Sequence, residues 1–482
     1  MSPAHSIENQ DQRLLSHILE FSKTCRFKLY IVGGFLRDII LGRERANPDI
    51  DFALKKNAIK FAAGLAKHLK AGFVVLDKTN GCARLVKRIQ DRIYTLDFTD
   101  FRGRNLQQDL LKRDFSINTL AVELRAFLKD PNCQLLDPYC GLKDLKSRII
   151  RAVNHSAFDD DPLRILRTFS LASILNFKIE RQTLRLVDKK KNKLKTASYE
   201  RIRDELFKIL VSPRSFEFLT QLDRHRILEL IIPEIKAMHR LKQGPYHHLD
   251  VWRHTLETIK ELEKIIKNFT RNQDVQDYLN EEVSGRPSQR YELIKLGALM
   301  HDIGKPKTLR KEDGKITFRG HERLGSDMFE EIARRLKLSN DEIAVVKRMV
   351  LYHLRPGYLA DNPVLTPRAK FRFFRDAGEE AVGVLLISLA DQRATKGTLT
   401  TLKSRRRHER IVRHLIKEYF QKKKAKKPLR LVGGDDLIRY FKLEPSPLIG
   451  KILSQIEESV GIGKIRTKRE ALKIAERILT RA

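Results

Sequence analysis

Two aspartates one residue apart, Asp49 and Asp51, lie in the segment DIDFAL. Alternate side chains of a β-strand point to the same face, so both carboxylates share one face and Ile50 points to the other. Adjacent carboxylates repel each other, and a divalent cation relieves the repulsion. Mg²⁺ prefers one or two carboxylates together with phosphate oxygens. The spacing therefore predicts a Mg²⁺ site on a strand, with Asp97 of YTLDF as a third carboxylate on a neighbouring strand.

The residues before this pair suit a phosphate group. Gly33 and Gly34 fall between the apolar run KLYIV and the helix-like FLRDIILG. Glycine lacks Cβ, so backbone N–H groups there can approach a phosphate at a helix N-terminus, and Arg37 offers a forked guanidinium to the same group. The set predicts a site for a nucleoside triphosphate and two metals, one activating an attacking hydroxyl and one stabilising the leaving pyrophosphate. A tight turn followed by a solvated acidic strand end fits the same letters equally well.

A second group of metal-ligating residue types lies further along the chain. Imidazole and carboxylate ligands on helices suit a divalent transition metal. The core of this group is His254 in DVWRHTLE, His301 and Asp302 in LMHDIGKP, and Asp391 in SLADQRA. His321 and His353 are candidates for a second metal or for phosphate binding.

The elements that must position these residues follow from the hydrophobic pattern. Residues 10–150 mix short strands with helices, and GFVVLDKTNGCARLVKRI predicts a hairpin that turns at Asn80 and Gly81. From about Asp160 onward the pattern is almost wholly helical. The lysine-rich QKKKAKKP, at 421–428, predicts an exposed linker or RNA-facing loop. We therefore expect an α+β fold, with a mixed or antiparallel sheet in a small head followed by a long all-α body.

Composition limits the class of protein. The 482 residues are enough for three or four domains. Lys plus Arg number 96 against 61 for Asp plus Glu, and a net charge of +35 favours a polyanionic partner, either nucleic acid or a membrane surface. We find no signal-peptide h-region, no apolar run long enough to span a bilayer, and no CxxC spacing among the four cysteines. The sequence thus predicts a cytoplasmic protein without membrane segments and leaves the oligomeric state open.

Five ordered stretches resemble a known family. The Gly-Gly, Arg-Asp and Asp-x-Asp series of residues 33–51 resembles the nucleotidyltransferase signature of the DNA polymerase β superfamily. Four more stretches resemble motifs of class II CCA-adding tRNA nucleotidyltransferases and bacterial poly(A) polymerases: DLLKRDFSINTLAVEL (109–124), DPYCGLKDL (137–145), DDPLRILRTFSLASILNF (160–177) and SYERIRDELFKIL (198–210). Ser116, Thr119 and Asp160 replace the usual Thr, Ala and Glu, which leaves the substrate subtype open.

The resemblance assigns roles to residues of the second and fourth stretches. It implies that Asp114 and Asn118, four apart and so on one face of a helix, lie near the ribose and triphosphate of the incoming nucleotide. It also implies that Asp161 and Arg164, with Arg167 one turn beyond, select the base. Independently of the resemblance, Asp161 followed by Pro162 reads as an N-cap and first residue of a helix.

The histidine-rich group resembles the HD phosphohydrolase superfamily. That resemblance implies hydrolysis of phosphomonoesters or 2′,3′-cyclic phosphates at RNA ends. Residues 431–479 resemble the C-terminal helical domain of HD-bearing members. We expect a nucleotidyltransferase head at 10–150, a helical neck at 151–235 that binds nucleobase and RNA, an HD domain at 236–420 and a helical tail at 429–482.

The main hypothesis is a template-independent nucleotidyltransferase that adds CCA, or part of it, to tRNA 3′ ends from CTP and ATP and releases pyrophosphate. In it Asp49 and Asp51 hold Mg²⁺, Asp97 assists, and a transition metal is possible at the HD site. Alternatives within the class are a poly(A) polymerase and an enzyme that adds only CC or only the final A. Rivals from other classes are an HD phosphohydrolase with a nucleotide-binding head and a non-catalytic RNA-binding protein.

Overall fold

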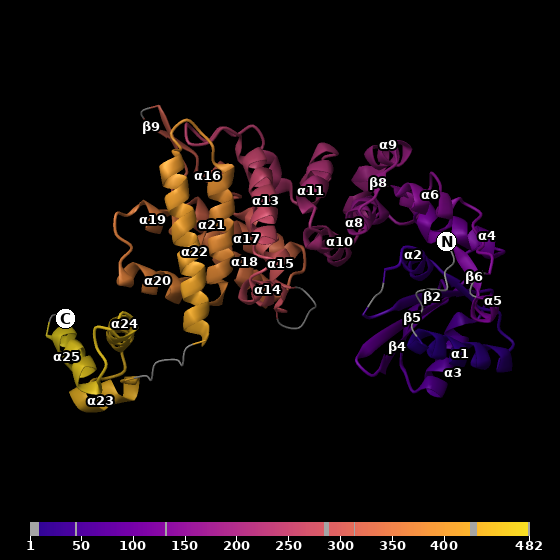
Figure 1. Cartoon of the computed structure of the whole chain (residues 1–482), viewed down its shortest axis with the longest axis horizontal. Coiled ribbons are helices and arrows are strands. Elements are labelled where there is room, and N and C mark those ends of the chain that lie inside the picture. The colour runs from indigo at the N-terminus through magenta and orange to yellow at the C-terminus, as the bar shows by residue number, and fades with distance from the viewer. Residues whose placement is uncertain are drawn as a thin grey trace. The chain divides into compact units, whose positions relative to one another are not determined.

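The structure, a computed structural model, describes residues 9–43, 46–130, 133–283, 289–312, 314–424 and 431–480 (Figure 1). The chain forms two compact units, Met1–Ile209 and Leu210–Ala482. The first contains a mixed sheet and the second is almost wholly helical, so the expected α+β class is confirmed.

The sheet of the first unit has six strands in the order β3-β4-β5-β2-β1-β6. Only β2 and β5 pair in parallel, and the other neighbours are antiparallel, as expected for a mixed sheet. The strands are β1 (Tyr30–Val32), β2 (Asp49–Leu54), β3 (Gly72–Asp77), β4 (Cys82–Ile89), β5 (Arg92–Asp100) and β6 (Ala121–Glu123).

One face of this sheet is covered by helices. Phe52 and Phe98 stack with ring centroids 4.8 Å apart, and Phe61 of α3 (Ala58–Leu69) packs on Phe98 at 5.3 Å. Phe21 of α1 (Asn9–Thr24) continues the layer against Phe61 at 5.5 Å. Because side chains alternate along each strand, the residues between these aromatics point to the opposite face, which carries the predicted carboxylates.

The connection between β3 and β4 differs from the predicted turn. It spans residues 78–81, and of these only Gly81 has a positive φ, at +58°. The carboxylate of Asp77 accepts the N–H groups of Thr79 and Asn80 at 2.8 and 3.0 Å. The hairpin is therefore correct, but the turn is built around Asp77 instead of a two-residue Asn80-Gly81 turn.

Helices complete the first unit. Asp161 is not the N-cap of the helix that follows it, because α8 begins only at Arg164; the Asp161 carboxylate instead accepts the N–H of Leu163 at 3.2 Å in the preceding turn. A two-stranded sheet joins β7 (Ile149–Ile150) and β8 (Lys178–Ile179). The other helices are α2 (Gly34–Ile40), α4 (Leu106–Leu111), α5 (Leu124–Lys129), α6 (Gly141–Ser147), α7 (Ala157–Asp160), α8 (Arg164–Leu175), α9 (Arg181–Lys190) and α10 (Tyr199–Val211), which crosses the unit boundary.

The second unit is built around α21, whose sequence AVGVLLISLA is apolar on all sides and buried. Helices α13, α21 and α22 run side by side (Figure 1). The elements are α11 (Ser215–Arg224), α12 (Leu228–Ile231), α13 (Val251–Asn268), α14 (Gln273–Asn280), α15 (Arg290–Met300), α16 (Lys305–Thr308), β9 (Arg310–Glu312), β10 (Lys315–Thr317), α17 (His321–Arg335), α18 (Asn340–Tyr352), α19 (Arg355–Asp361), α20 (Pro367–Ala377), α21 (Ala381–Ala394), α22 (Leu402–Lys424), α23 (Gly434–Phe441), α24 (Pro447–Gly461) and α25 (Lys468–Leu479).

The lysine-rich stretch predicted as a linker is partly helical. Residues 421–424 form the end of α22, and residues 425–428 lie outside the described residues. The last three helices have an apolar core of their own, which includes Leu437, Ile452 and Ala471.

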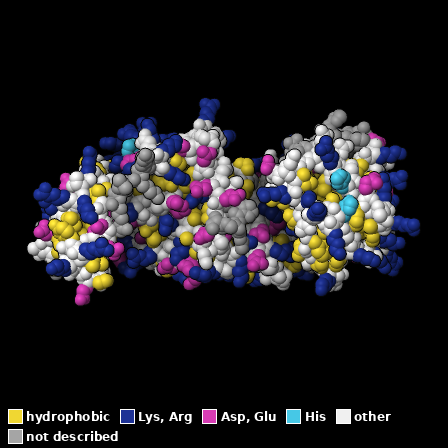
Figure 2. Space-filling view, turned by 90° about the horizontal axis from the view of Figure 1, so that it is seen from below, with side chains coloured by type: hydrophobic (Ala, Val, Ile, Leu, Met, Phe, Trp, Pro, Cys, Tyr) yellow, Lys and Arg dark blue, Asp and Glu magenta, His cyan; other side chains and the backbone are white. Residues whose placement is uncertain are grey.

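Positive charge is spread widely over the surface. Dark blue Lys and Arg side chains are scattered over the whole visible face (Figure 2). Within the described part of the chain, no helix is both long enough and apolar enough to cross a bilayer.

Candidate active site and metal centre

Three carboxylates meet on the open face of the head sheet. β2 and β5 lie in parallel register with Asp51 opposite Asp97, and Asp49 is two residues earlier on β2. Ligand oxygens of the three aspartates lie within 4.8 Å of one another, and Ile50 is fully buried on the other face. A set of carboxylate oxygens alone fits a hard cation such as Mg²⁺.

The electrostatics of this triad favour cation binding. Loss of hydration raises the pKa of Asp51 to about 6, and the charges of Asp49 and Asp97 add to the rise while Arg113 opposes it. Arg84 on β4 binds Asp97 with two parallel bonds, from Nε and Nη2, each 2.7 Å long. A bound cation would take the place of the proton that Asp51 otherwise holds near pH 6.

The glycine turn leaves room beside the carboxylates. Gly33 has a φ of +81° and caps the N-terminus of α2. A Cβ atom there would lie 2.6 Å from Asp51 Oδ2 and 2.9 Å from Arg113 Nη1, so a larger residue would displace both side chains and would also strain the backbone at this positive φ. The turn therefore brings bare backbone against both a carboxylate and a guanidinium, where a triphosphate can be held.

Arg37 binds other side chains within the protein. Its side chain is buried, and it binds Asp38 through Nε at 2.9 Å and the Asn118 Oδ1 through Nη1 at 2.7 Å. In this structure Arg37 holds Asn118 in the cavity wall, and its contact with phosphate stays a prediction.

Asp114 and Asn118 are in contact, although not on an α-helix. The Asn118 Nδ2 donates to Asp114 Oδ1 at 2.9 Å across a turn that ends in the 3₁₀ segment Ser116–Asn118. Burial would raise the pKa of Asp114, but Arg167, whose Nε lies 3.1 Å away, and Asn118 hold that pKa below its usual range. The pair forms an ionised, hydrogen-bonded wall of the cavity.

Asp161 and Arg164 line the same cavity and are joined by a backbone bond, from the Arg164 N–H to the Asp161 carbonyl at 3.1 Å, while their side chains bind other partners. The buried guanidinium of Arg164 donates to backbone carbonyls, and Asp161 Oδ2 accepts from Arg201 Nη2 at 2.7 Å. The carbonyls held by Arg164 are those of Lys112, Arg113 and Ala157, at 2.8–3.1 Å. Arg164 is thus fixed in place, whereas Asp161 has a partly exposed, exchangeable partner.

All the predicted head and neck residues line one cavity of about 600 Å³ within the first unit. The sequence did not single out four basic residues that also line it: Arg84, Arg102, Arg113 and Lys208. Arg113 stands next to Asp114 in the KRD stretch, which is a usable signal. Arg84 is placed only by cross-strand register, which no local pattern reveals.

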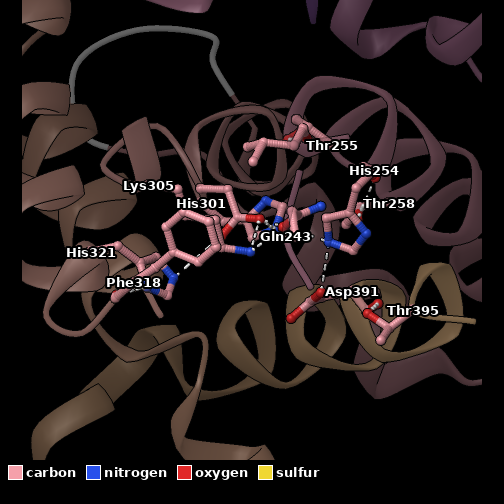
Figure 3. Close-up of polar contacts among 12 residues, drawn as sticks. Gln243, His254, Thr255, Thr258, His301, Lys305, Phe318, His321, Asp391 and Thr395 are labelled. Carbon is pink, nitrogen blue, oxygen red and sulfur yellow. Dashed lines mark hydrogen bonds and ion pairs between the residues drawn. The ribbon is translucent and has the colours of Figure 1, made fainter. Parts of the chain in front are cut away.

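The predicted histidines and aspartates of the second unit converge in its interior. His254, His301, His321 and Asp391 come from different elements toward one centre (Figure 3). With Asp302 and His353, these residues form two groups of three. Within each group the ligand atoms lie within 4.8 Å of one another. The first group is His254, His301 and Asp391, and the second is Asp302, His321 and His353.

Asp302 lies between the two groups. Its Oδ2 is 3.2 Å from His301 Nε2, and its Oδ1 is 3.3 Å from His321 Nε2. One carboxylate oxygen thus faces each group, as a carboxylate that bridges two metal ions requires. The arrangement is compatible with a second metal at His321 and His353, and the choice between a second metal and phosphate binding there stays a prediction.

The protonation pattern suits metal ligands. The Nδ1 atoms of three histidines each face a backbone carbonyl, so the lone pair of each Nε2 faces the centre. These pairs are His301 with Ala298 at 2.7 Å, His321 with Phe318 at 2.8 Å and His353 with Val350 at 2.6 Å. Burial lowers the pKa of His353 to about 3, and His301 and His321 lower it further. Burial would lower the pKa of His301 too, but the charge of Asp302 beside it raises that pKa, so a cation bound there takes the place of a proton. Imidazoles beside carboxylates suit a divalent transition metal.

Three neighbours of this centre were not predicted. Lys305 Nζ lies 2.6 Å from Asp302 Oδ2 and donates to Gln243 Oε1 at 2.7 Å. The ring of His247 packs edge-on against His254, and burial, then Lys305, lowers the pKa of His247 to about 3. Lys305 belongs to the HDIGKP stretch, but nothing in the sequence around His247 marks it.

Comparison with known families gives three matches along the chain. Residues 29–151 match the poly A polymerase head domain, and residues 251–396 match the HD domain. Between them, residues 176–238 match a family described as the probable RNA and SrmB-binding site of polymerase A.

Individual relatives span nearly the whole chain. The A-adding tRNA nucleotidyltransferase of Deinococcus radiodurans is 29% identical, over 93% of this chain and 94% of the relative. The CC-adding tRNA nucleotidyltransferase of Thermus thermophilus is also 29% identical, over 91% of each chain. The solved Thermotoga maritima CCA-adding enzyme complexed with tRNA superposes with a TM-score of 0.63 at 22% identity, covering 99% of this chain and 97% of that one. This last likeness shows a shared fold.

Proposed function

The chain belongs to the family of class II tRNA nucleotidyltransferases and poly(A) polymerases that carry an HD domain, and from this we propose that it adds C and A nucleotides to tRNA 3′ ends without a template. The acceptor 3′-hydroxyl attacks the α-phosphate of CTP or ATP, and pyrophosphate leaves. The observation that carries the proposal is the convergence of residues from separate motifs on one cavity, with the acidic triad beside the glycine turn.

We propose Mg²⁺ as the cation of this site, held by Asp49, Asp51 and Asp97. When bound, Mg²⁺ supplies positive charge that activates the attacking hydroxyl and stabilises the leaving pyrophosphate. The chain contributes the backbone at Gly33, which approaches the triphosphate, and Arg113, which offers guanidinium donors beside it. We also propose a cytoplasmic location, which the proposed tRNA substrate and the four free cysteines support.

The test is one incubation series with tRNA transcripts that lack CCA or end in C, CC or CCA, each mixed with CTP, ATP or both. Addition of CCA supports the full activity. Addition of CC alone or of the final A alone identifies a partial enzyme, a question that relatives of both kinds at 29% identity leave open. ATP-only tailing of any RNA indicates a poly(A) polymerase, and no incorporation at all overturns the proposal.

We predict that base selection depends on Asp161 and Arg164. An ionised Asp only accepts hydrogen bonds and Arg only donates, so the pair matches the amino donor and ring-nitrogen acceptor of cytosine and adenine. Guanine and uracil present the opposite polarity and leave buried groups unpaired, at about 1–3 kcal/mol each. Asp161→Asn should therefore reduce discrimination against UTP and GTP by about tenfold or more, measured as relative incorporation of the four nucleotides.

The matched control is Arg201→Gln, which removes the Asp161 partner but keeps the carboxylate. It should leave selectivity near that of wild type. Arg164→Ala is a less clean variant, because the backbone carbonyls that Arg164 holds lose their donors and the melting temperature should fall. If Asp161→Asn folds and selects as wild type does, Asp161 only shapes the turn before α8.

A second activity is favoured by the bridging position of Asp302. We propose that the centre formed by the two histidine and aspartate groups hydrolyses phosphomonoesters or 2′,3′-cyclic phosphates at RNA ends. The residues of both groups would hold a pair of divalent transition metals, which supply a hydroxide nucleophile when bound. Phosphatase and cyclic phosphodiesterase assays with Mn²⁺, Ni²⁺, Co²⁺ or Mg²⁺ test it.

A further inference from the structure

The open face of the head sheet continues beyond the acidic triad. Strand register pairs Asp51 with Asp97, Asp97 with Arg84, and Arg84 with Val74, so these side chains form one row across β2, β5, β4 and β3. All four lie on the face opposite α3. The row thus runs from the carboxylates to the edge strand of the sheet.

The part of this face beyond the triad combines cations with exposed aliphatic groups. Val74, Val86 and Ile93 are 48%, 42% and 37% exposed, values unusual for residues of a central sheet. Register places Val86 opposite Thr95, and the exposed Arg88 opposite Ile93, on the same face as Arg84. Exposed apolar groups next to arginines suit a ligand with both apolar surfaces and negative charge.

One edge of the Arg84 guanidinium binds Asp97, and the other edge is available to a ligand. Its Nε and Nη2 bind Asp97, its side chain is 39% exposed, and its Nη1 makes no hydrogen bond or ion pair with any residue that the structure describes. The guanidinium is planar, so an edge that is fixed by Asp97 directs the remaining donors to a defined position. That position lies beside Asp97, one of the three carboxylates proposed to hold the cation that activates the attacking hydroxyl.

The direction of approach follows from the proposed function, on which this inference rests. The glycine turn, Asn118 and Asp161 line the cavity on the side of β1 and the neck, where the nucleotide is proposed to bind. In an in-line displacement the attacking hydroxyl arrives opposite the leaving pyrophosphate. The acceptor strand therefore reaches the triad from the other side, over β4 and β3.

We propose that the open face of β3, β4 and β5 docks the 3′-terminal nucleotides of the acceptor RNA. Arg84 and Arg88 contact the last phosphodiesters, and Val74, Val86 and Ile93 contact the ribose and the face of the terminal base. Contacts to phosphate and to apolar faces do not read base edges. Such a surface accepts strand ends that differ in their last nucleotide, as repeated addition of nucleotides to one end requires.

The test compares Arg84→Gln, Arg84→Lys and Val74→Asp with wild type. Two quantities are measured: the KM for the acceptor and for CTP, and the Kd of a fluorescent tRNA minihelix in EDTA. Arg84→Gln and Val74→Asp should raise the acceptor KM and the minihelix Kd about tenfold, and leave the KM for CTP within about twofold. Arg84→Lys should recover part of the loss, because it keeps the charge but not the fork.

The matched control is Lys60→Gln, which removes one charge from the exposed side of α3, on the opposite side of the sheet. It should leave the minihelix Kd unchanged. If Arg84→Gln raises the KM for CTP and leaves the minihelix Kd unchanged, Arg84 only orients Asp97 and the inference is wrong. If wild type incorporates no nucleotide, the proposed function fails, while the Kd in EDTA still decides whether this face binds RNA.

Discussion

Asp49→Ala and Asp51→Ala should each reduce nucleotide incorporation at least about 10³-fold, because each removes a ligand from a site where developing charge is stabilised. The three carboxylates have ligand oxygens within 4.8 Å of one another, so no remaining pair reproduces the set. The measurement is incorporation of labelled CTP and ATP into a tRNA transcript that lacks CCA. Full activity in the double variant would contradict the assignment.

We expect Asp51→Ala to lose activity without losing stability. Desolvation raises the folded-state pKa of Asp51 to about 6, above the ordinary carboxyl value, so ionisation of Asp51 costs free energy in the folded state. The cost is absent at low pH, grows as pH rises above about 3.8 and is complete above about 6. In EDTA at neutral pH, Asp51→Ala should therefore melt no lower than wild type. Asp91→Ala, which removes an exposed carboxylate between β4 and β5, is the matched control and should keep full activity.

Sequence periodicity predicted the residues that a single element positions. The strand period of two placed Asp49 and Asp51 on one face and Ile50 in the core, as the structure has them. Periodicity failed where the chain leaves regular structure. Asp161 followed by Pro162 is typical of a helix start. In the structure the chain makes a further turn before α8 begins at Arg164, and the Asp161 carboxylate accepts the N–H of Leu163.

Local sequence patterns could not predict contacts between segments that are distant in the sequence. Helical spacing predicted that Asp114 and Asn118 lie on one face. The two side chains are in contact, but the contact is made across a turn that is not α-helical, so the predicted helix was wrong. Arg84 has no neighbour in sequence that marks it, and only the register of β4 on β5 brings it to Asp97. The order of His and Asp residues placed the second centre, but only the structure shows Asp302 between its two groups.

Asp302→Asn should remove both metal ions from the second centre and reduce any phosphohydrolase activity at least about 100-fold. Each oxygen of the carboxylate faces a different group, whereas an amide offers a single, neutral oxygen. His321→Gln touches only one group, so it should lose one of two metals. Metal content of the purified protein after loading with Mn²⁺, Ni²⁺ or Co²⁺ is measured by mass spectrometry.

Three measurements separate metal loss from damage to the fold. The buried Asp302 lies 2.6 Å from Lys305, so Asp302→Asn leaves a cation without its partner, and thermal melting must be followed. Asp327→Asn, an exposed position of α17, is the matched control and should keep both metals. Nucleotide addition by the first unit should persist in Asp302→Asn, because its cavity contains no residue of this centre. If folded Asp302→Asn still carries two metals per chain, Asp302 does not bridge them and the proposed dinuclear centre is wrong.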